Sequence, residues 1–230
     1  MPWKKSKNII FIHGWASGPY VWLRQASHFN NKCKVHTPRL EGDGAGITDF
    51  IIKNKLDDIC LVGWSLGGMI SMQAAAQLKG KVSRLVLIGA PAQFTQKAVM
   101  GKIYNKMEKD FQGTLEWFYK FCFSSNERSR NEFSHIIKLV GDFIEPLDKE
   151  EVLTGLKILM EMDVRHILDK ITMPALIIQG GQDRVCPPEA AQFLARRLKN
   201  AKVKLFETAG HAPFLTHPEE VNLLIEEFIT

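Results

Sequence analysis

Three residues in this sequence have the side chains that together cleave esters, and they occur in the chain order Ser65, Asp183, His211. A serine hydroxyl becomes a nucleophile when a histidine takes its proton, and a carboxylate holds that histidine in the correct tautomer. The chemistry that this set predicts is two-step acyl transfer, in which the serine carries the acyl group before water releases it. It needs no metal and no organic cofactor.

Ser65 is the best-defined of the three because its surroundings are specific. An apolar run ends in the G-x-S-x-G pattern of residues 63–67, and an alanine-rich helical stretch, Met69 to Leu78, follows at once. A strand, a tight turn and a helix would hold the serine hydroxyl open at a sheet edge, with Gly63 and Gly67 leaving room for the strained turn. The alternative is a glycine-rich turn with an idle serine.

Asp183 and His211 each follow a predicted strand, as Ser65 does. The carboxyl ends of parallel strands lie on the same edge of a sheet, so the three side chains are expected to meet there. Taken singly, Asp183 could be a turn residue and His211 a loop histidine; the joint order is what favours a triad. The remaining histidines outside residues 13–15 look incidental: His28, His36, His135, His166 and His217.

An oxyanion hole completes the predicted site. One N–H should come from Leu66, directly after the nucleophile, and the second from the loop after an early strand. His13-Gly14-Trp15 fits that loop, and we assign the second donor to the Trp15 backbone. We expect His13 to brace the loop and to take no part in the chemistry.

Strands that alternate with helices must position these residues. Apolar runs predict strands at 8–12, 34–37, 59–62, 85–88, 175–179 and 203–206, and helices are expected at 47–53, 69–78, 189–198 and 219–228. This alternation predicts an α/β fold with a doubly wound, mostly parallel sheet.

Residues 95–170 break the alternation, since they contain helical patterns and no convincing strand. Phe111, Leu115, Phe118 and Cys122 recur at helical spacing. We therefore predict a core formed by residues 1–94 and 171–230, with residues 95–170 inserted as a helical lid over the carboxyl edge of the sheet.

The composition limits the possible partners. The net charge is +5, but basic and acidic residues nearly balance in residues 95–170, and no basic stripe carries interleaved aromatic residues, which argues against nucleic acid. The apolar runs are too short to span a membrane, and no signal peptide is recognisable. The four cysteines lack metal-binding or C-x-x-C spacing. We expect a cytoplasmic monomer whose cysteines are reduced and which binds no metal.

These motifs resemble the α/β-hydrolase superfamily over essentially the whole chain. Within it, the sequence is most similar to the pimeloyl-acyl-carrier-protein methyl ester carboxylesterases of biotin synthesis. The residues that carry this similarity are His13-Gly14-Trp15, the segment 63–68, the lid segments 110–118 and 155–165, and His211-Ala212-Pro213-Phe214 with His217-Pro218.

The resemblance implies an ester substrate carried on acyl carrier protein. It places substrate contacts on Trp15, Ser65, Leu66, His211 and the lid stretch Phe118, Tyr119, Lys120, Phe121 and Cys122. Trp64 and Phe94 are further candidates for lining an acyl channel. The alternative for Phe118 is a purely structural core position.

The sequence also departs from that family. Where members grip the acidic carrier with lid arginines, this chain has Gly113 and Trp117 at two places, leaving Arg130, with Arg128, Lys120 and Lys138 nearby. Other hypotheses therefore stay open: a general short-chain carboxylesterase or enol-lactonase, a haloperoxidase or C–C hydrolase on the same scaffold, or a catalytically silent binding protein.

Overall fold

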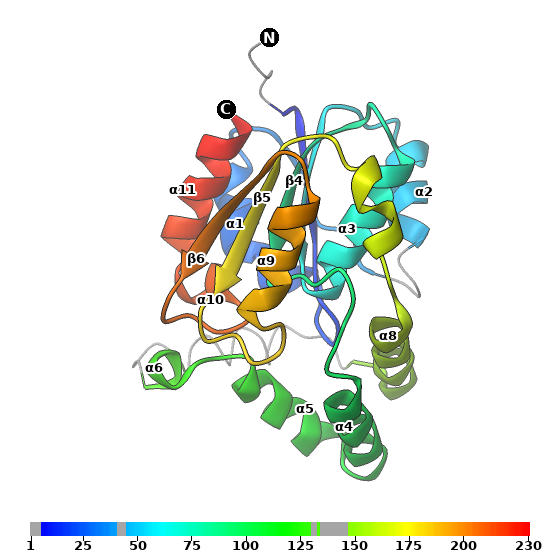
Figure 1. Cartoon of the computed structure of the whole chain (residues 1–230), viewed down its shortest axis with the longest axis vertical. Coiled ribbons are helices and arrows are strands. Elements are labelled where there is room, and N and C mark those ends of the chain that lie inside the picture. Colours follow the sequence, from blue (N-terminus) through cyan, green and yellow to red (C-terminus); the bar gives the residue numbers. More distant parts are fainter. Residues whose placement is uncertain (1–5, 41–44, 130–132, 134–146) are drawn as a thin grey trace.

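The computed structural model describes residues 6–40, 45–129, 133 and 147–230, and within them six strands form one sheet (Figure 1). The strand order is β2-β1-β3-β4-β5-β6, and every neighbouring pair is parallel. The strands are β1 (Asn8–Ile12), β2 (Lys34–His36), β3 (Ile59–Trp64), β4 (Val82–Ile88), β5 (Ala175–Gly180) and β6 (Ala201–Phe206). The predicted parallel α/β sheet is confirmed.

Helices cover both faces of the sheet, which explains why the central strands consist mainly of apolar residues. One face carries α1 (Leu23–Phe29) and α11 (Pro218–Ile229), and the other carries α2 (Ala45–Lys53), α3 (Leu66–Gln77) and α9 (Pro188–Arg197) (Figure 1). Two short elements, η1 (Pro19–Trp22) and α10 (Pro213–Thr216), precede α1 and α11. The pair η1 and α1 is absent from the sequence prediction.

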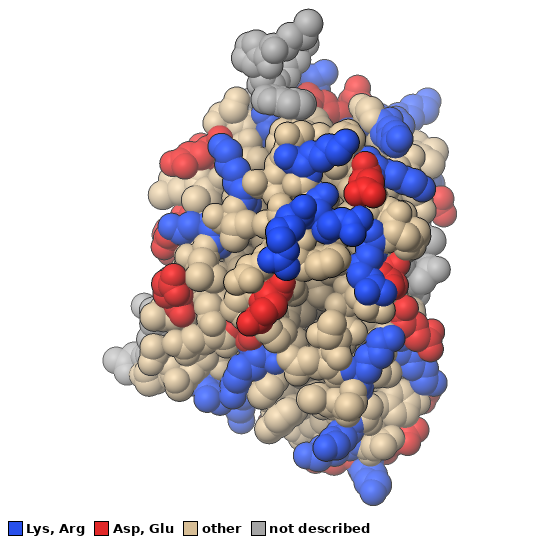
Figure 2. Space-filling view, in the orientation of Figure 1, with Lys and Arg blue, Asp and Glu red and all other residues tan. Residues whose placement is uncertain are grey.

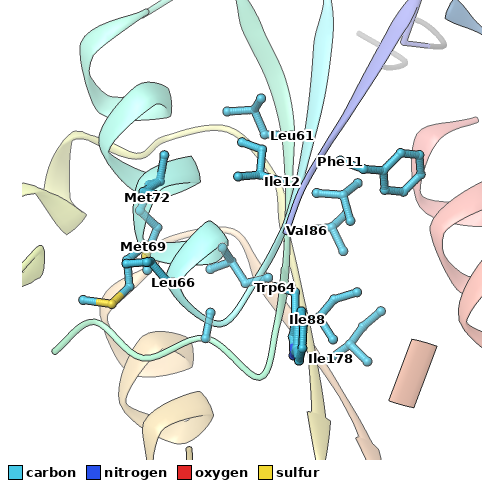
Figure 3. Packing of buried hydrophobic residues seen from close by; sticks show 14 of the residues in the cluster. Phe11, Ile12, Leu61, Trp64, Leu66, Met69, Met72, Val86, Ile88 and Ile178 are labelled. Carbon is cyan, nitrogen blue, oxygen red and sulfur yellow. The ribbon is translucent and has the colours of Figure 1, made fainter. Parts of the chain in front are cut away.

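The core sits on both sides of β1, β3 and β4. Ile12 and Leu61 lie on the side of α3, whereas Phe11, one residue earlier in β1, points to the opposite side (Figure 3). This alternation is the two-residue period of a strand, and both faces are buried because helices cover both.

A group of helices lies beyond the carboxyl edge of the sheet (Figure 1). They are α4 (Lys97–Lys109), α5 (Phe111–Phe121), α6 (Ser125–Arg128) and α8 (Lys149–Glu161), and η2 (Arg165–Lys170) then packs beside α3. Phe118 and Leu115 on α5 are buried, as their spacing predicts. The division into a core of 1–94 and 171–230 and a lid of 95–170 stays a prediction.

None of the helices that the structure describes is both long enough and apolar enough to cross a bilayer.

Candidate active site

Ser65 lies at the apex of the turn between β3 and α3. Its backbone has φ 54° and ψ −119°, a strained region that a non-glycine residue occupies only when its surroundings enforce it. The surroundings do so here, because the Ser65 N–H donates to the Ile88 carbonyl at 3.0 Å and the Ser65 carbonyl accepts from Gly68 N–H at 2.9 Å. The nucleophile predicted from sequence thus sits on a strand-to-helix turn fixed at both sides.

Two glycines make this turn possible through close approach. A Cβ on Gly63 would overlap the Gly67 carbonyl and the Ser71 hydroxyl, and a Cβ on Gly67 would overlap the carbonyls of Ile12 and His13. The first turn of α3 can therefore pack directly on the ends of β3 and β1, which brings Ser65 beside the loop that follows β1.

Asp183 and His211, from the loops after β5 and β6, are brought together. His211 Nδ1 lies 2.8 Å from Asp183 Oδ2, and both side chains are buried. The other oxygen, Oδ1, accepts the N–H groups of Val185 (2.9 Å) and Cys186 (2.8 Å), so the carboxylate is fixed in place. Donation from Nδ1–H leaves Nε2 as the basic nitrogen, which is the tautomer a general base needs.

Two further residues hold this pair, and sequence reasoning missed both roles. The Gln179 side-chain amide donates to Asp183 Oδ2 (3.3 Å) and to the Cys186 carbonyl (3.0 Å). The Trp64 indole N–H donates to the His211 carbonyl at 2.9 Å, and the two rings lie 5.4 Å apart. Trp64 was considered for an acyl channel, whereas its indole packs against the histidine loop.

The two residues assigned as oxyanion donors come from the start of α3 and from the loop after β1. Leu66 begins α3, and the first N–H groups of a helix have no partner within it. On the other side, a Cβ on Gly14 would lie 3.3 Å from the Ser65 Cβ, so the loop before Trp15 runs next to the nucleophile. Trp15 and Leu66 both line one cavity of about 460 Å³.

His13 braces this loop, as expected. Leu40 N–H donates to His13 Nε2 at 3.0 Å, and His13 Nδ1 contacts the Gly14 carbonyl at 3.0 Å. These two contacts require a neutral ring with its proton on Nδ1. Burial lowers the pKa of His13 to about 4. The hydrogen bond to the Gly14 carbonyl acts in the opposite direction, and the positive charge of Arg39 lowers the pKa slightly further.

Two cavities lie near Ser65, which lines neither of them and is itself only 5% exposed. The larger, already described, is also lined by Arg39, Asp148, Glu150, Glu151 and Val152. The second, of about 320 Å³, is lined mainly by apolar residues, among them Phe94, Pro91, Val185, Cys186 and Phe193. Cys186 connects it to the site, because its backbone N–H donates to Asp183 Oδ1.

The stretch 118–122 reaches the catalytic loops through contacts of several kinds. Phe118 packs edge to face on Trp15, with ring centroids 4.8 Å apart, and the Tyr119 hydroxyl donates to the Ala16 carbonyl at 2.6 Å. Cys122 is buried, and its carbonyl accepts His211 N–H at 2.6 Å.

The other two residues of this stretch face outward or pack on the lid. Phe121 stacks on Trp117, with the Arg184 guanidinium 4.3 Å from its ring, and Lys120 is exposed. Roles for residues 118–122 as substrate contacts stay predictions. Two basic residues considered for carrier binding, Arg130 and Lys138, lie outside the described residues.

Across the part of the chain that the structure describes, no three His, Cys, Asp or Glu side chains are grouped as a metal site would need.

Comparison with known proteins links this arrangement to hydrolases. The model of a family described as "Alpha/beta hydrolase family" matches residues 9–222. A pimeloyl-[acyl-carrier protein] methyl ester esterase of Aromatoleum aromaticum is 30% identical, with 96% of this chain and 98% of that protein covered. The protein of the same name from Nitrosomonas europaea is 27% identical over 93% and 92% of the two chains.

Solved structures show the same fold at lower identity. An esterase from Exiguobacterium antarcticum superposes with a TM-score of 0.87 at 21% identity, covering 98% of this chain and 92% of that one. An enol-lactonase from Burkholderia xenovorans LB400 gives a TM-score of 0.84 at 17% identity, covering 100% and 93%. At these identities the likeness shows the fold alone.

Proposed function

The chain belongs to the α/β-hydrolase family, and from this premise we propose that it is a carboxylic ester hydrolase with Ser65 as its nucleophile. The observation that carries the proposal is the buried 2.8 Å hydrogen bond between His211 and Asp183 at the sheet edge where Ser65 occupies its strained turn. What distinguishes His211 from the buried His13 is its carboxylate partner, because a carboxylate on Nδ1 orients the ring and stabilises the imidazolium of a general base.

The reaction runs in two halves. His211 Nε2 takes the Ser65 proton while Oγ attacks the ester carbonyl, and the N–H groups of Trp15 and Leu66 bind the oxyanion. Collapse breaks the bond to the alkoxide, which leaves as the alcohol with the proton from His211. Water then attacks the acyl-enzyme by the same route and releases the acid. Asp183 holds the ring and stabilises the imidazolium.

Hydrolysis of a p-nitrophenyl ester by purified protein tests this proposal. Ser65→Ala should lower kcat by about 10⁵-fold or more, as removal of a serine nucleophile does. Ser129→Ala is the matched control, because that hydroxyl lies on the exposed end of α6 and contacts only the Asn126 carbonyl among the hydrogen bonds of described residues. Hydrolysis that persists unchanged in Ser65→Ala would refute the mechanism.

For the substrate, we propose the methyl ester of a pimeloyl chain on acyl carrier protein, cleaved in the cytoplasm by a monomeric enzyme. Relatives that bear this activity in their names align along nearly the whole chain. An apolar cavity of about 320 Å³ beside Cys186 suits a polymethylene chain, and methanol needs little room to leave. Helices α4 to α8 would act as the lid above it.

The lid offers a basic stripe for the acidic carrier. Lys102, Lys106 and Lys109 follow one face of α4 and are exposed, and some Lys and Arg side chains are visible at this end of the molecule (Figure 2). Lys106 Nζ lies 5.8 Å from the ring of Trp117, an exposed aromatic residue on α5. Exposed aromatic and basic groups together are typical of a docking surface for an acidic protein.

Two experiments test the carrier. Reversing the three lysine charges to glutamate should lower kcat/KM for the carrier-bound ester, most strongly at low salt, and leave that for a free p-nitrophenyl ester unchanged. The gene should also restore growth without biotin to a strain lacking its own esterase of this kind. Soluble, esterase-active protein that fails to restore growth would overturn the carrier-bound substrate and leave the triad standing.

A small free ester or an enol-lactone is the second candidate. It is favoured by the acidic side chains of Asp148, Glu150 and Glu151 at the 460 Å³ cavity, which would repel an acidic carrier near that opening. Comparing kcat/KM for the carrier-bound methyl ester with that for free short-chain esters and an enol-lactone separates the two candidates.

A further inference from the structure

Glu127 is a buried carboxylate that contacts the histidine loop from the lid side. It is 1% exposed, and it lies on the short helix α6. Its Oε2 accepts the N–H groups of Ser124 at 2.7 Å and Gly210 at 2.8 Å, and its Oε1 accepts the Thr216 hydroxyl at 2.6 Å. Gly210 directly precedes His211, so one carboxylate joins the start of α6 to the peptide before the catalytic base.

Local helix capping explains only part of this arrangement. Ser124 and Glu127 form a capping box, in which each side chain binds the backbone N–H of the other residue. The bond to Gly210 is not part of such a box, because it spans 83 residues of sequence. A capping residue also has no need to be fully buried between two elements.

Neighbouring contacts fix the same loop against the same segment. The Cys122 carbonyl accepts His211 N–H at 2.6 Å, and the Ser124 hydroxyl donates to the Thr208 carbonyl at 2.7 Å. A Cβ on Gly210 would overlap the Cys122 carbonyl, so the loop lies directly on the lid backbone.

We propose that Glu127 is a positioning residue, which sets the place of the His211 ring through the Gly210 peptide. This role rests on the proposed function. Without the carboxylate, the Gly210 and Ser124 N–H groups would be buried and unpaired, and the loop would shift to satisfy them. A shift of about 1 Å in a catalytic group can cost about 10²-fold in rate.

Three substitutions at this position test the proposal with a p-nitrophenyl ester as substrate. Glu127→Ala removes every contact, and Glu127→Asp keeps the charge but withdraws the oxygens by one methylene. Glu127→Gln keeps the length, with its carbonyl able to face Gly210 and its amide able to face Thr216. We expect kcat to fall about tenfold or more in the alanine and aspartate variants, with KM within about twofold, and to recover to within about threefold in the glutamine variant.

A matched control separates positioning from stability. Asp110 caps α5 through Gly113 N–H at 3.0 Å, and among the described residues none of its hydrogen bonds reaches the histidine loop. Asp110→Ala should therefore destabilise α5 and leave kcat unchanged. The rate at which a phosphonate ester labels Ser65 should fall with kcat in Glu127→Asp and not in Asp110→Ala.

The outcomes discriminate between the roles of Glu127. If Glu127→Asp leaves kcat and the labelling rate unchanged, Glu127 has no positioning role. If Glu127→Gln is as slow as Glu127→Asp, the position requires a negative charge, and the positioning role is again overturned. Because the wild-type rate and its loss in Ser65→Ala test the triad separately, these results overturn the role of Glu127 alone. If Glu127→Ala does not fold, the aspartate and glutamine variants decide.

Discussion

Lowering the pH from 7 to 5 should destabilise the protein through the buried imidazole of His13. In the folded state burial disfavours the imidazolium, so the pKa of His13 falls from 6.5 to about 4 despite the opposing hydrogen bond to the Gly14 carbonyl. The neutral ring then accepts the Leu40 N–H at Nε2. When folding lowers the pKa of a histidine, the ring is neutral in both the folded and the unfolded chain at any pH above the unfolded pKa, and the protein has its full stability there. That stabilisation is lost as the pH falls from 6.5 towards 4, because the unfolded chain then binds a proton that the folded chain excludes.

The magnitude follows from the pKa difference. A shift from 6.5 to about 4 corresponds to about 3 kcal/mol in total, of which about 2 kcal/mol should be lost between pH 7 and pH 5. This is a sizeable part of the roughly 5–15 kcal/mol by which domains are stable.

Reversible urea unfolding, followed by tryptophan fluorescence at the two pH values, measures the effect. Carboxylates stabilised in the folded state also lose stabilisation in acid, so the informative quantity is the difference between wild type and His13→Gln. Glutamine can accept from Leu40 and donate to Gly14 but does not titrate. The free energy of unfolding should therefore fall by about 2 kcal/mol less in His13→Gln than in wild type.

The exposed residue His166 supplies the control, because His166→Gln removes an imidazole that is not buried. Its loss of stability between pH 7 and pH 5 should equal that of wild type. If His13→Gln loses as much stability as wild type over this range, the imidazole of His13 is not held neutral in the folded protein, and the reasoning from its hydrogen bonds is wrong.

Tyr119→Phe removes the hydroxyl that donates to the Ala16 carbonyl. Loss of this hydrogen bond should lower the free energy of unfolding in urea by about 1 kcal/mol and should lower kcat for a p-nitrophenyl ester. A change in KM alone would instead indicate a substrate contact. Asp183→Asn should lower kcat about 10³–10⁴-fold with the fold intact by circular dichroism, because the tautomer of the base is lost. Gly63→Ala should lower the free energy of unfolding in urea by about 3 kcal/mol or more, because the new Cβ would overlap backbone atoms. Gly101→Ala on α4 should instead raise it by about 0.5–1 kcal/mol, because a Cβ there meets nothing within 4 Å and alanine favours the helix.

The sheet could be predicted because its central strands are buried on both faces and therefore contain apolar runs. The start of β4 was nevertheless predicted three residues late, because Ser83 and Arg84 interrupt its apolar run. The edge strand β6 is harder to predict, because Lys202 and Val203 are exposed and its apolar residues do not form a run from its first position. The sequence predicted its start two residues after the observed one. Helix α1 was missed because it is seven residues long and buries only Gln25 and Phe29. A short helix with two buried positions has too little periodicity to be recognised.

The sequence could predict those residues of the candidate site that directly follow strands. Ser65, Asp183 and His211 each follow a strand, so the parallel topology brings them to one edge without knowledge of any tertiary contact. Contacts made by backbone carbonyls, such as that of Cys122 with His211, depend on no particular side chain and leave no sequence signal. Glu127 did leave one, the S-x-x-E capping box, but nothing near it indicates Gly210.

The segment from 119 to 127 therefore does more than lie beyond the sheet edge, since it bonds to the loops that follow β1, β5 and β6. Tyr119 binds the oxyanion loop at Ala16, and the Arg184 guanidinium, beside Asp183, donates to the carbonyls of Phe121 (3.0 Å) and Phe123 (3.1 Å). Cys122 and Glu127 bind the histidine loop. A change that displaces this segment must break its bonds to each of these loops and leave the buried Gly210 and His211 N–H groups unpaired, so the placement of this segment and the geometry of the candidate site are physically coupled.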